Sequence, residues 1–341
     1  MDKPNLVVSS SWCQGGRPSM EDKLCLDVQR TESGKLKYAL LGVFDGHGGA
    51  CAADCAAEIF PEQLKQKLSE HSCPKKAMIE AFKATNDLMY QNSKHWKPLS
   101  RLNCPSLAGT TATVALICGD TLTIANCGDS VAVLGIKNQY SFGDCGWYPV
   151  GIRGSVVHSI KGDEKKRIKR MGGTISDSLS DTRIVYDGCV NHCWVDRQRC
   201  SHKRMFRPIL NMSRALGDFW SYNADVGDYV ISCVPHVASY SLQDDSIFGL
   251  CLHTDGVQMS PCAIARCLAG DNAEEKENLA RIPKSGCLAE EILNNSMKSV
   301  IDLSKTDNAT VITVLFDSLL GCEVTETGSE LGNGKTFRIS A

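Results

Sequence analysis

The chain has 341 residues, of which 37 are basic and 39 acidic, so its formal net charge at pH 7 is −2. This balance argues against a protein that binds nucleic acid or a membrane surface through general electrostatic attraction. No apolar run approaches the ~20 residues that a membrane-spanning helix needs, and the first residues contain neither a signal-peptide core nor a myristoylation glycine. We therefore expect a soluble cytoplasmic protein, with the nucleus as the alternative location.

The length fits one large domain or two small ones. The 18 cysteines are scattered through segments that we expect to be buried, as at Cys55, Cys118, Cys251 and Cys267. A chain of this size can build its own core. Reduced thiols that act as small apolar side chains therefore explain the cysteines better than disulfides do.

The predicted elements begin with a short strand at 24–28 and a fully apolar strand at 38–44. An alanine-rich segment then predicts a helix at 49–70, interrupted or kinked at Pro61. A second helix is expected at 75–95, where apolar side chains recur on one stripe.

The middle of the chain is rich in strand signals. Two apolar runs, 110–118 and 121–127, are joined by Gly119-Asp120 and predict a β-hairpin with a two-residue turn. Gly128-Asp129-Ser130 then leads into a third strand at 131–136. The later elements are strands at 247–252 and 309–316 and helices at 163–171, 260–269 and 285–303. Meandering strands mixed with helix pairs predict an α+β layered fold rather than a parallel sheet.

The end of the chain differs from the rest. Residues 321–341 are polar and contain several glycines, so we expect a mobile tail without visible chemistry. All the predicted elements fall within residues 1–320, which we assign to a single domain.

Acidic residues flank several predicted strands. Asp45-Gly-His47 follows the apolar strand at 38–44, where a carboxylate beside glycine can offer both its own oxygens and a bare carbonyl to a cation. The same placement recurs at Glu21, Asp22, Asp255 and Asp307. Each acid alone would be an ordinary solvated loop residue, but together they predict a site for hard cations such as Mg²⁺ or Mn²⁺. His47 could donate a proton to a leaving group there.

Eight short motifs occur in one order over roughly residues 10–317. They are Arg17–Asp22, Phe44–Gly49, Gly109–Ala112, Ala125–Ser130, Arg167–Gly173, Ser213–Asp218, Thr254–Gly256 and Asp307–Asn308. In this combination the chain resembles the metal-dependent serine/threonine protein phosphatases of the 2C type. The resemblance implies a β-sandwich of two antiparallel sheets flanked by helices on both faces.

The resemblance also implies the reaction. Phosphoserine and phosphothreonine in protein substrates would be hydrolysed by water activated between two Mg²⁺ or Mn²⁺ ions, and no other cofactor is expected. The metal ligands implied by the family are Glu21, Asp45, the carbonyl of Gly46, Asp255 and Asp307. Asp45 would bridge the two ions, and Asp22 would orient water or a ligand beside them. Arg17 would grip the phosphate, and His47 would protonate the leaving oxygen.

Two positions depart from the family pattern. Asp129 matches an acid that can hold a weaker third ion together with Asp255. Met259 replaces a second acid that is common four residues after the equivalent of Asp255, so a third ion should be weak or absent here. Val131 stands where an arginine often occurs.

The resemblance implies a variable flap at 138–208, beside the active site. Its basic residues are Arg197, Arg199, Lys203, Arg204 and Arg207. They would either be solvated or select acidic or multiply phosphorylated substrates.

Three alternatives stay open. His192-Cys193 followed by Arg199 has the spacing of a thiol-dependent phosphatase, although its loop lacks the glycines that such chemistry needs. A zinc site could be formed by Cys189, His192, Cys193, Cys200 and His202. The protein could also be a weak or inactive scaffold with the phosphatase fold. Without heptad repeats or an interface pattern, we expect a monomer.

Overall fold

The strand β3 (Leu36–Phe44) is apolar from Tyr38 to its end, because this part is buried on both faces. Side chains of a strand alternate between its two faces. Those of Tyr38, Leu40 and Phe44 pack against one helical layer, whereas Ala39, Leu41 and Val43 pack against a second sheet. The computed structural model describes residues 5–96, 106–139, 147–177, 182–189, 204–243, 246–270, 287–298, 300, 302–317 and 335–339.

Two antiparallel sheets form the centre of the molecule. The five-stranded sheet has the order β16 (His236–Ser241), β7 (Thr121–Cys127), β6 (Ala112–Cys118), β3 and β2 (Lys23–Arg30). The six-stranded sheet has the order β19 (Lys335–Ile339), β1 (Asn5–Cys13), β18 (Ala309–Asp317), β17 (Ile247–His253), β8 (Val131–Gln139) and β9 (Trp147–Arg153). Their facing sides enclose one apolar core.

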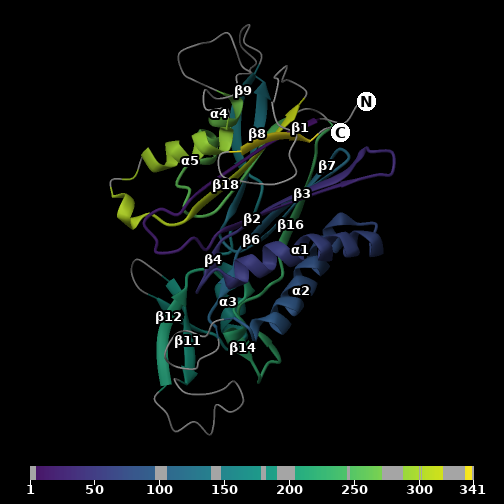
Figure 1. The fold of residues 1–341 in the computed structure, drawn as a ribbon. Helices are drawn as coiled ribbons and strands as arrows, with labels where there is room; N and C mark the ends of the chain where they lie inside the picture. Colours follow the sequence, from purple (N-terminus) through teal and green to yellow (C-terminus); the bar gives the residue numbers. More distant parts are fainter. Residues whose placement is uncertain are drawn as a thin grey trace.

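Helices cover both outer faces of this sandwich (Figure 1). The helices α1 (Cys51–Glu70) and α2 (Pro74–Ser93) pack on the five-stranded sheet, and α4 (Pro261–Ala269) and α5 (Leu288–Lys298) pack on the six-stranded sheet. The predicted α+β sandwich is confirmed. None of the helices that the structure describes is long and apolar enough to cross a membrane.

Several local predictions are also confirmed. The predicted hairpin forms between β6 and β7, with Cys118 opposite Thr121. The predicted interruption at Pro61 is wrong, since α1 runs through Pro61 as one element. The neighbouring Phe60 packs between Phe44 and Phe82, with ring centroids 6.4 and 5.0 Å away. Every cysteine side chain that the structure describes is a free thiol.

The chain changes sheets after β7. The strand β8 pairs with β17 and β9 in the six-stranded sheet rather than continuing the meander of the five-stranded sheet. Asp129 therefore lies in the short connection that crosses from one sheet to the other.

The flap region has two parts. The strand β9 lies inside the predicted flap but belongs to the main sheet. The helix α3 (Gly162–Arg170) is followed by a separate sheet of β10 (Thr174–Asp177), β11 (Thr182–Cys189) and β12 (Arg204–Leu210), which extends from the lower end of the view in Figure 1. This part has its own small core, which includes Ile168, Ile184 and Leu210.

The short elements are a three-stranded sheet, a two-stranded sheet and two 3₁₀ turns. They are β13 (Leu216–Gly217), β5 (Gly109–Thr110) and β4 (Gly46–His47); β14 (Tyr222–Asn223) and β15 (Asp228–Tyr229); and the turns Phe219–Ser221 and Leu303–Lys305.

The predicted mobile tail is wrong for its last segment. Lys335–Ile339 forms β19, which pairs with β1 through Leu6 opposite Ile339. Ile339 is buried in the core between the sheets, and this burial favours the strand over a solvated tail. The rest of the predicted tail lies outside the described residues.

Glu164 ties the flap to the chain that leads into the site. Its carboxylate accepts hydrogen bonds from Arg167 at 3.1 Å, from Arg214 at 2.6 Å and from the hydroxyl of Ser213 at 2.8 Å. Burial raises the pKa of Glu164, but the hydrogen bonds and the two guanidinium charges outweigh this effect and lower it to about 2.

We predict that Glu164→Gln lowers the free energy of unfolding at pH 7 by about 2–3 kcal/mol, because two half-buried arginines lose their counter-ion. The folded pKa of Glu164, about 2, lies below its ordinary value of 4.5. Its contribution is therefore complete above the ordinary value and is lost as the pH falls toward 2. Urea unfolding measures both effects. The exposed neighbour Asp163 supplies the control, since Asp163→Asn should change stability by less than about 0.5 kcal/mol. Equal losses in the two variants would contradict the prediction.

Candidate functional site

The predicted acids meet at one end of the sandwich because of strand register. Lys23, the first residue of β2, lies opposite Phe44, the last residue of β3. Asp22 and Asp45 are therefore neighbours across these two strands.

The other sheet brings its own acids to the same end. His253, the last residue of β17, lies opposite both Val311 of β18 and Val131 of β8. Asp255, Asp307 and Asp129 lie just beyond these residues, and the charges of all three contribute to raising the pKa of Asp45. The structure thus brings together every acid that the sequence singled out at a strand end.

Asp22 links the two sheets. Its Oδ2 accepts hydrogen bonds from the hydroxyls of Thr254 at 2.9 Å and Thr310 at 2.7 Å, both of which belong to the six-stranded side. Asp22 is only 3% exposed. Burial, followed by the charges of Asp255 and Asp307, outweighs these hydrogen bonds and raises the pKa of Asp22 to about 6.

Repulsion among buried carboxylates dominates the electrostatics. Burial and then the charges of Asp22, Asp255 and Asp129 raise the pKa of Asp45 well above its ordinary value. Burial and then Asp255 likewise raise the pKa of Asp129 to about 6. Burial and Asp307 raise the pKa of Asp255, although a hydrogen bond with Asp45 opposes this shift. Such a cluster attracts cations strongly.

The backbone around Asp45 is held rigidly. Its N–H donates to the hydroxyl of Thr111 at 3.0 Å, and its carbonyl accepts from the N–H of Thr111 at 2.9 Å. A Cβ at Gly46 would lie 2.4 Å from the carbonyl oxygen of Glu21, so only glycine fits there.

Glu21 and Arg17 lie at the rim of the site. The N–H of Glu21 donates to the side chain of Asn308 at 2.7 Å, and its Oε2 accepts from the N–H of Gly49 at 3.1 Å. Arg17 forms an ion pair with Asp307, and 57% of its side chain remains exposed. The guanidinium is therefore accessible to an anion at the edge of the acidic cluster.

The donor atoms of the cluster suit hard divalent cations. All of them are carboxylate or carbonyl oxygens, which Mg²⁺ and Mn²⁺ prefer. Oδ1 of Asp22 and Oδ1 of Asp129 are buried and have no hydrogen-bond partner among the described residues. The residues present thus fit such ions, both in chemistry and in unused ligand atoms.

His47 is bound to an acid that sequence reasoning missed. Its Nε2 lies 2.8 Å from Oδ2 of Asp218, which is fully buried. Burial lowers the pKa of His47, but the charge and hydrogen bond of Asp218, with smaller contributions from Asp129 and Glu21, outweigh this and raise it. In the sequence, the only sign of a role for Asp218 is its position at the end of one of the eight motifs.

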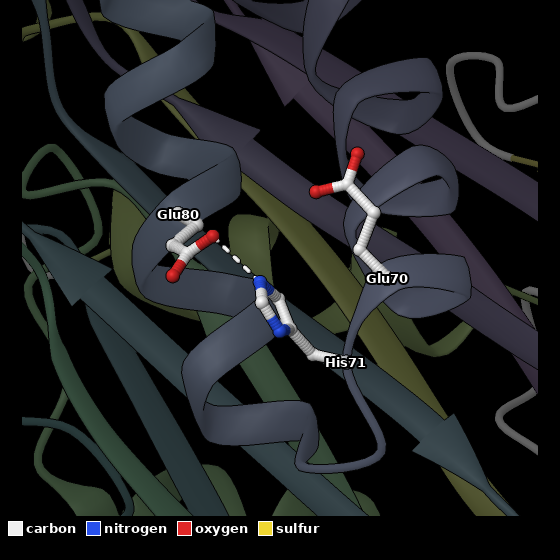
Figure 2. A group of neighbouring side chains, drawn as sticks. All are labelled: Glu70, His71 and Glu80. Carbon is white, nitrogen blue, oxygen red and sulfur yellow. Dashed lines mark hydrogen bonds and ion pairs between the residues drawn. The ribbon is translucent and has the colours of Figure 1, made fainter.

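A second group of carboxylates and a histidine lies at the far end of α1 (Figure 2). His71 contacts Glu80 at 2.6 Å, while Glu70 is bound to Gln66 and Lys67. The group follows the last residue of α1, whereas His47 precedes the first, and the helix between them rises about 1.5 Å per residue over 20 residues. Its acids have hydrogen-bond partners of their own, and we regard it as a helix-to-helix connection.

Comparison with known proteins agrees with this geometry. The family profile of Protein phosphatase 2C matches residues 6–258. The chain belongs to the protein phosphatase 2C family.

Individual relatives in this family share about a third of their residues with the chain or fewer. The "Probable protein phosphatase 2C 21" of Oryza sativa subsp. japonica is 29% identical over 72% of this chain and 66% of its own length. The "Protein phosphatase 1L" of Bos taurus is 31% identical over 62% of this chain and 50% of its own. The chain thus spans between half and two thirds of these relatives. The "Probable protein phosphatase 2C 5" of Paramecium tetraurelia is 32% identical over 72% and 71%.

Solved structures share the fold. The "serine-threonine phosphatase 2C from Toxoplasma gondii" superposes with a TM-score of 0.65 at 22% identity, over 93% of this chain and 98% of that one. A "C.elegans sex determining protein" gives a TM-score of 0.61 at 17% identity, over 90% and 64%.

The structure explains the two positions at which this phosphatase 2C relative departs from the family pattern. Met259 and Val131 both pack in the core between the six-stranded sheet and its helices. Near these positions, His158 accepts a hydrogen bond at Nδ1 from the N–H of Gly128 at 3.2 Å. Burial followed by the charge of Arg214 lowers the pKa of His158 to about 4, so a neutral imidazole supports the turn beside Asp129.

We predict that Asp45→Asn stabilises the metal-free protein at pH 7.5 by on the order of 1 kcal/mol, because it removes one of several mutually repelling carboxylates. A raised carboxyl pKa means that the wild-type protein loses stability as the pH rises above about 4. The gain in the variant should therefore disappear near that pH. Thermal and urea unfolding in EDTA measure the difference. Asp120→Asn, at an exposed turn, should show no such gain; a destabilised Asp45→Asn protein would contradict the prediction.

Proposed function

We propose that this protein hydrolyses phosphoserine and phosphothreonine in protein substrates, using water activated between two divalent metal ions. The observation that carries the proposal is the convergence of acidic side chains from both sheets at one end of the sandwich, beside an exposed arginine and a histidine. Membership of the phosphatase 2C family supports the same reaction class.

The ions would be Mg²⁺ or Mn²⁺. Their ligands would be Glu21, Asp45, the carbonyl of Gly46, Asp255 and Asp307. When bound, two such ions acidify a water molecule and neutralise charge on the phosphoryl oxygens. Asp22 keeps the ligands in place through its threonine hydrogen bonds. Asp129 offers an unpartnered oxygen to a weak third ion, and the apolar Met259 supplies no ligand for it.

Arg17 and His47 would act on the substrate itself. A guanidinium matches two phosphate oxygens at once, and Arg17 can exchange part of its contact with Asp307 for a phosphate. His47 has a raised pKa, so a larger fraction of it carries the proton that the departing serine or threonine oxygen requires.

We also propose two tests for the flap region, one of substrate preference and one of zinc binding. Arg197, Arg199 and Lys203 lie outside the described residues, as do His192, Cys193, Cys200 and His202, and the side chains of Cys189, Arg204 and Arg207 are not described. Preference for acidic substrates can be tested by replacing Arg199, Lys203 and Arg204 with alanine and comparing phosphopeptides. Metal analysis tests the zinc alternative.

The deciding experiment is hydrolysis of a phosphothreonine peptide by the purified protein with Mn²⁺, with Mg²⁺ and with EDTA. We expect turnover that needs either metal, stops in EDTA and falls by more than about 100-fold in Asp45→Asn. The variant should remain folded, which circular dichroism checks.

Other outcomes would favour the other hypotheses. Activity that survives EDTA and is lost in Cys193→Ser would indicate thiol chemistry. Absence of turnover with either metal, from protein shown to be folded, would favour a scaffold that keeps the fold without the reaction.

A further inference from the structure

His47 and Asp218 meet across a glycine. His47 lies in β4, Asp218 directly follows β13, and β5 runs between these two strands. Gly109 of β5 pairs with His47 on one side and with Gly217 on the other. A Cβ at Gly109 would lie 2.2 Å from Oδ2 of Asp218 and 2.4 Å from Nε2 of His47. Only glycine leaves these side chains room to touch.

Asp218 is fixed in one orientation. It has a φ of +48° and is the single non-glycine residue with positive φ in the described part of the chain, a conformation that surrounding structure must enforce. Its Oδ1 accepts a hydrogen bond from Nε1 of Trp220 at 2.6 Å, and its N–H donates to the carbonyl of Ala108 at 3.0 Å. Oδ2 is thereby directed to His47.

This arrangement distinguishes the two nitrogens of His47. A carboxylate only accepts hydrogen bonds, so Nε2 of His47 must carry a proton to bond with it. Nδ1 is buried and has no hydrogen-bond partner among the residues that the structure describes. Nδ1 is therefore the nitrogen whose proton is available for transfer.

We propose that Asp218 is a positioning residue that directs Nε2–H of His47 toward itself and leaves Nδ1 to protonate the leaving group. This inference rests on the proposed phosphatase function. As the bond between phosphorus and the serine or threonine oxygen breaks, Nδ1 gives its proton to that oxygen and the ring becomes neutral. The oxygen of the attacking water forms the new bond to phosphorus and releases one proton to solvent, and solvent returns a proton to Nδ1.

Asp218→Asn separates this role from a purely structural one. Asparagine tolerates positive φ, and its Oδ1 can still accept from Trp220. The amide NH₂ group would then face Nε2 of His47, which must become an acceptor. In the neutral ring the proton would move to Nδ1.

The kinetic test compares a phosphothreonine peptide with p-nitrophenyl phosphate at saturating metal. We expect Asp218→Asn to lower kcat for the peptide by about 100-fold with little change in KM. The loss with p-nitrophenyl phosphate should be at least about tenfold smaller, because its phenolate leaves without a proton. In a His47→Gln background, Asp218→Asn should add little, since the two residues act as a unit. The exposed Asp225→Asn is the control and should resemble the wild type.

Equal losses on the two substrates, or additive effects of the two substitutions, would overturn the inference. Gly109→Ala provides an independent variant that keeps both side chains but separates them. It should reproduce the substrate-selective loss; an equal loss on both substrates would count against the inference.

A spectroscopic test needs no turnover. Long-range ¹H–¹⁵N spectra of histidine-labelled, metal-free protein, recorded at a pH high enough for the spectra to show a neutral ring, report which nitrogen carries the proton. We expect Nε2–H for His47 in the wild type and Nδ1–H in Asp218→Asn. The same tautomer in both proteins would overturn the inference. Absence of metal-dependent turnover by the wild type would overturn the proposed function instead, so the two failures are distinguishable.

Discussion

The hydrogen bonds of Asp22 are the constraint on which the site depends. One buried carboxylate oxygen accepts from Thr254 and Thr310, so an acid beside the start of β2 is bound to β18 and to the residue that follows β17 in the other sheet. These bonds fix how the ends of the two sheets meet. The acids at the neighbouring strand ends are then forced into the same small volume.

This convergence opposes folding in the absence of cations. Several carboxyl groups have raised pKa values because they are buried beside like charges. The apolar cores between the two sheets and under the two helical layers stabilise the fold and offset the free-energy cost of this repulsion. Such a division between a stable scaffold and a destabilised site is common where binding requires concentrated charge.

Glycines in the site motifs have a shared physical cause. A Cβ at Gly46 would lie 2.4 Å from the carbonyl oxygen of Glu21, and one at Gly256 would lie 2.0 Å from that of Asn308. Gly109 similarly makes room for the pair of His47 and Asp218. Gly46 and Gly256 thus mark places where one backbone segment passes directly against another, whereas Gly109 marks a place where two side chains meet.

The sequence by itself determined the apolar strands, the helices, the acids at strand ends and, through its motifs, the family. These signals are local, since hydrophobic periodicity and turn residues act within a few positions of each other. Tertiary structure alone decided that β8 joins the second sheet, that β19 covers the edge of β1, and that His47 meets an acid 171 residues away. Such contacts depend on how the sheets pack and on which backbone segments can approach closely, and no short stretch of sequence encodes either.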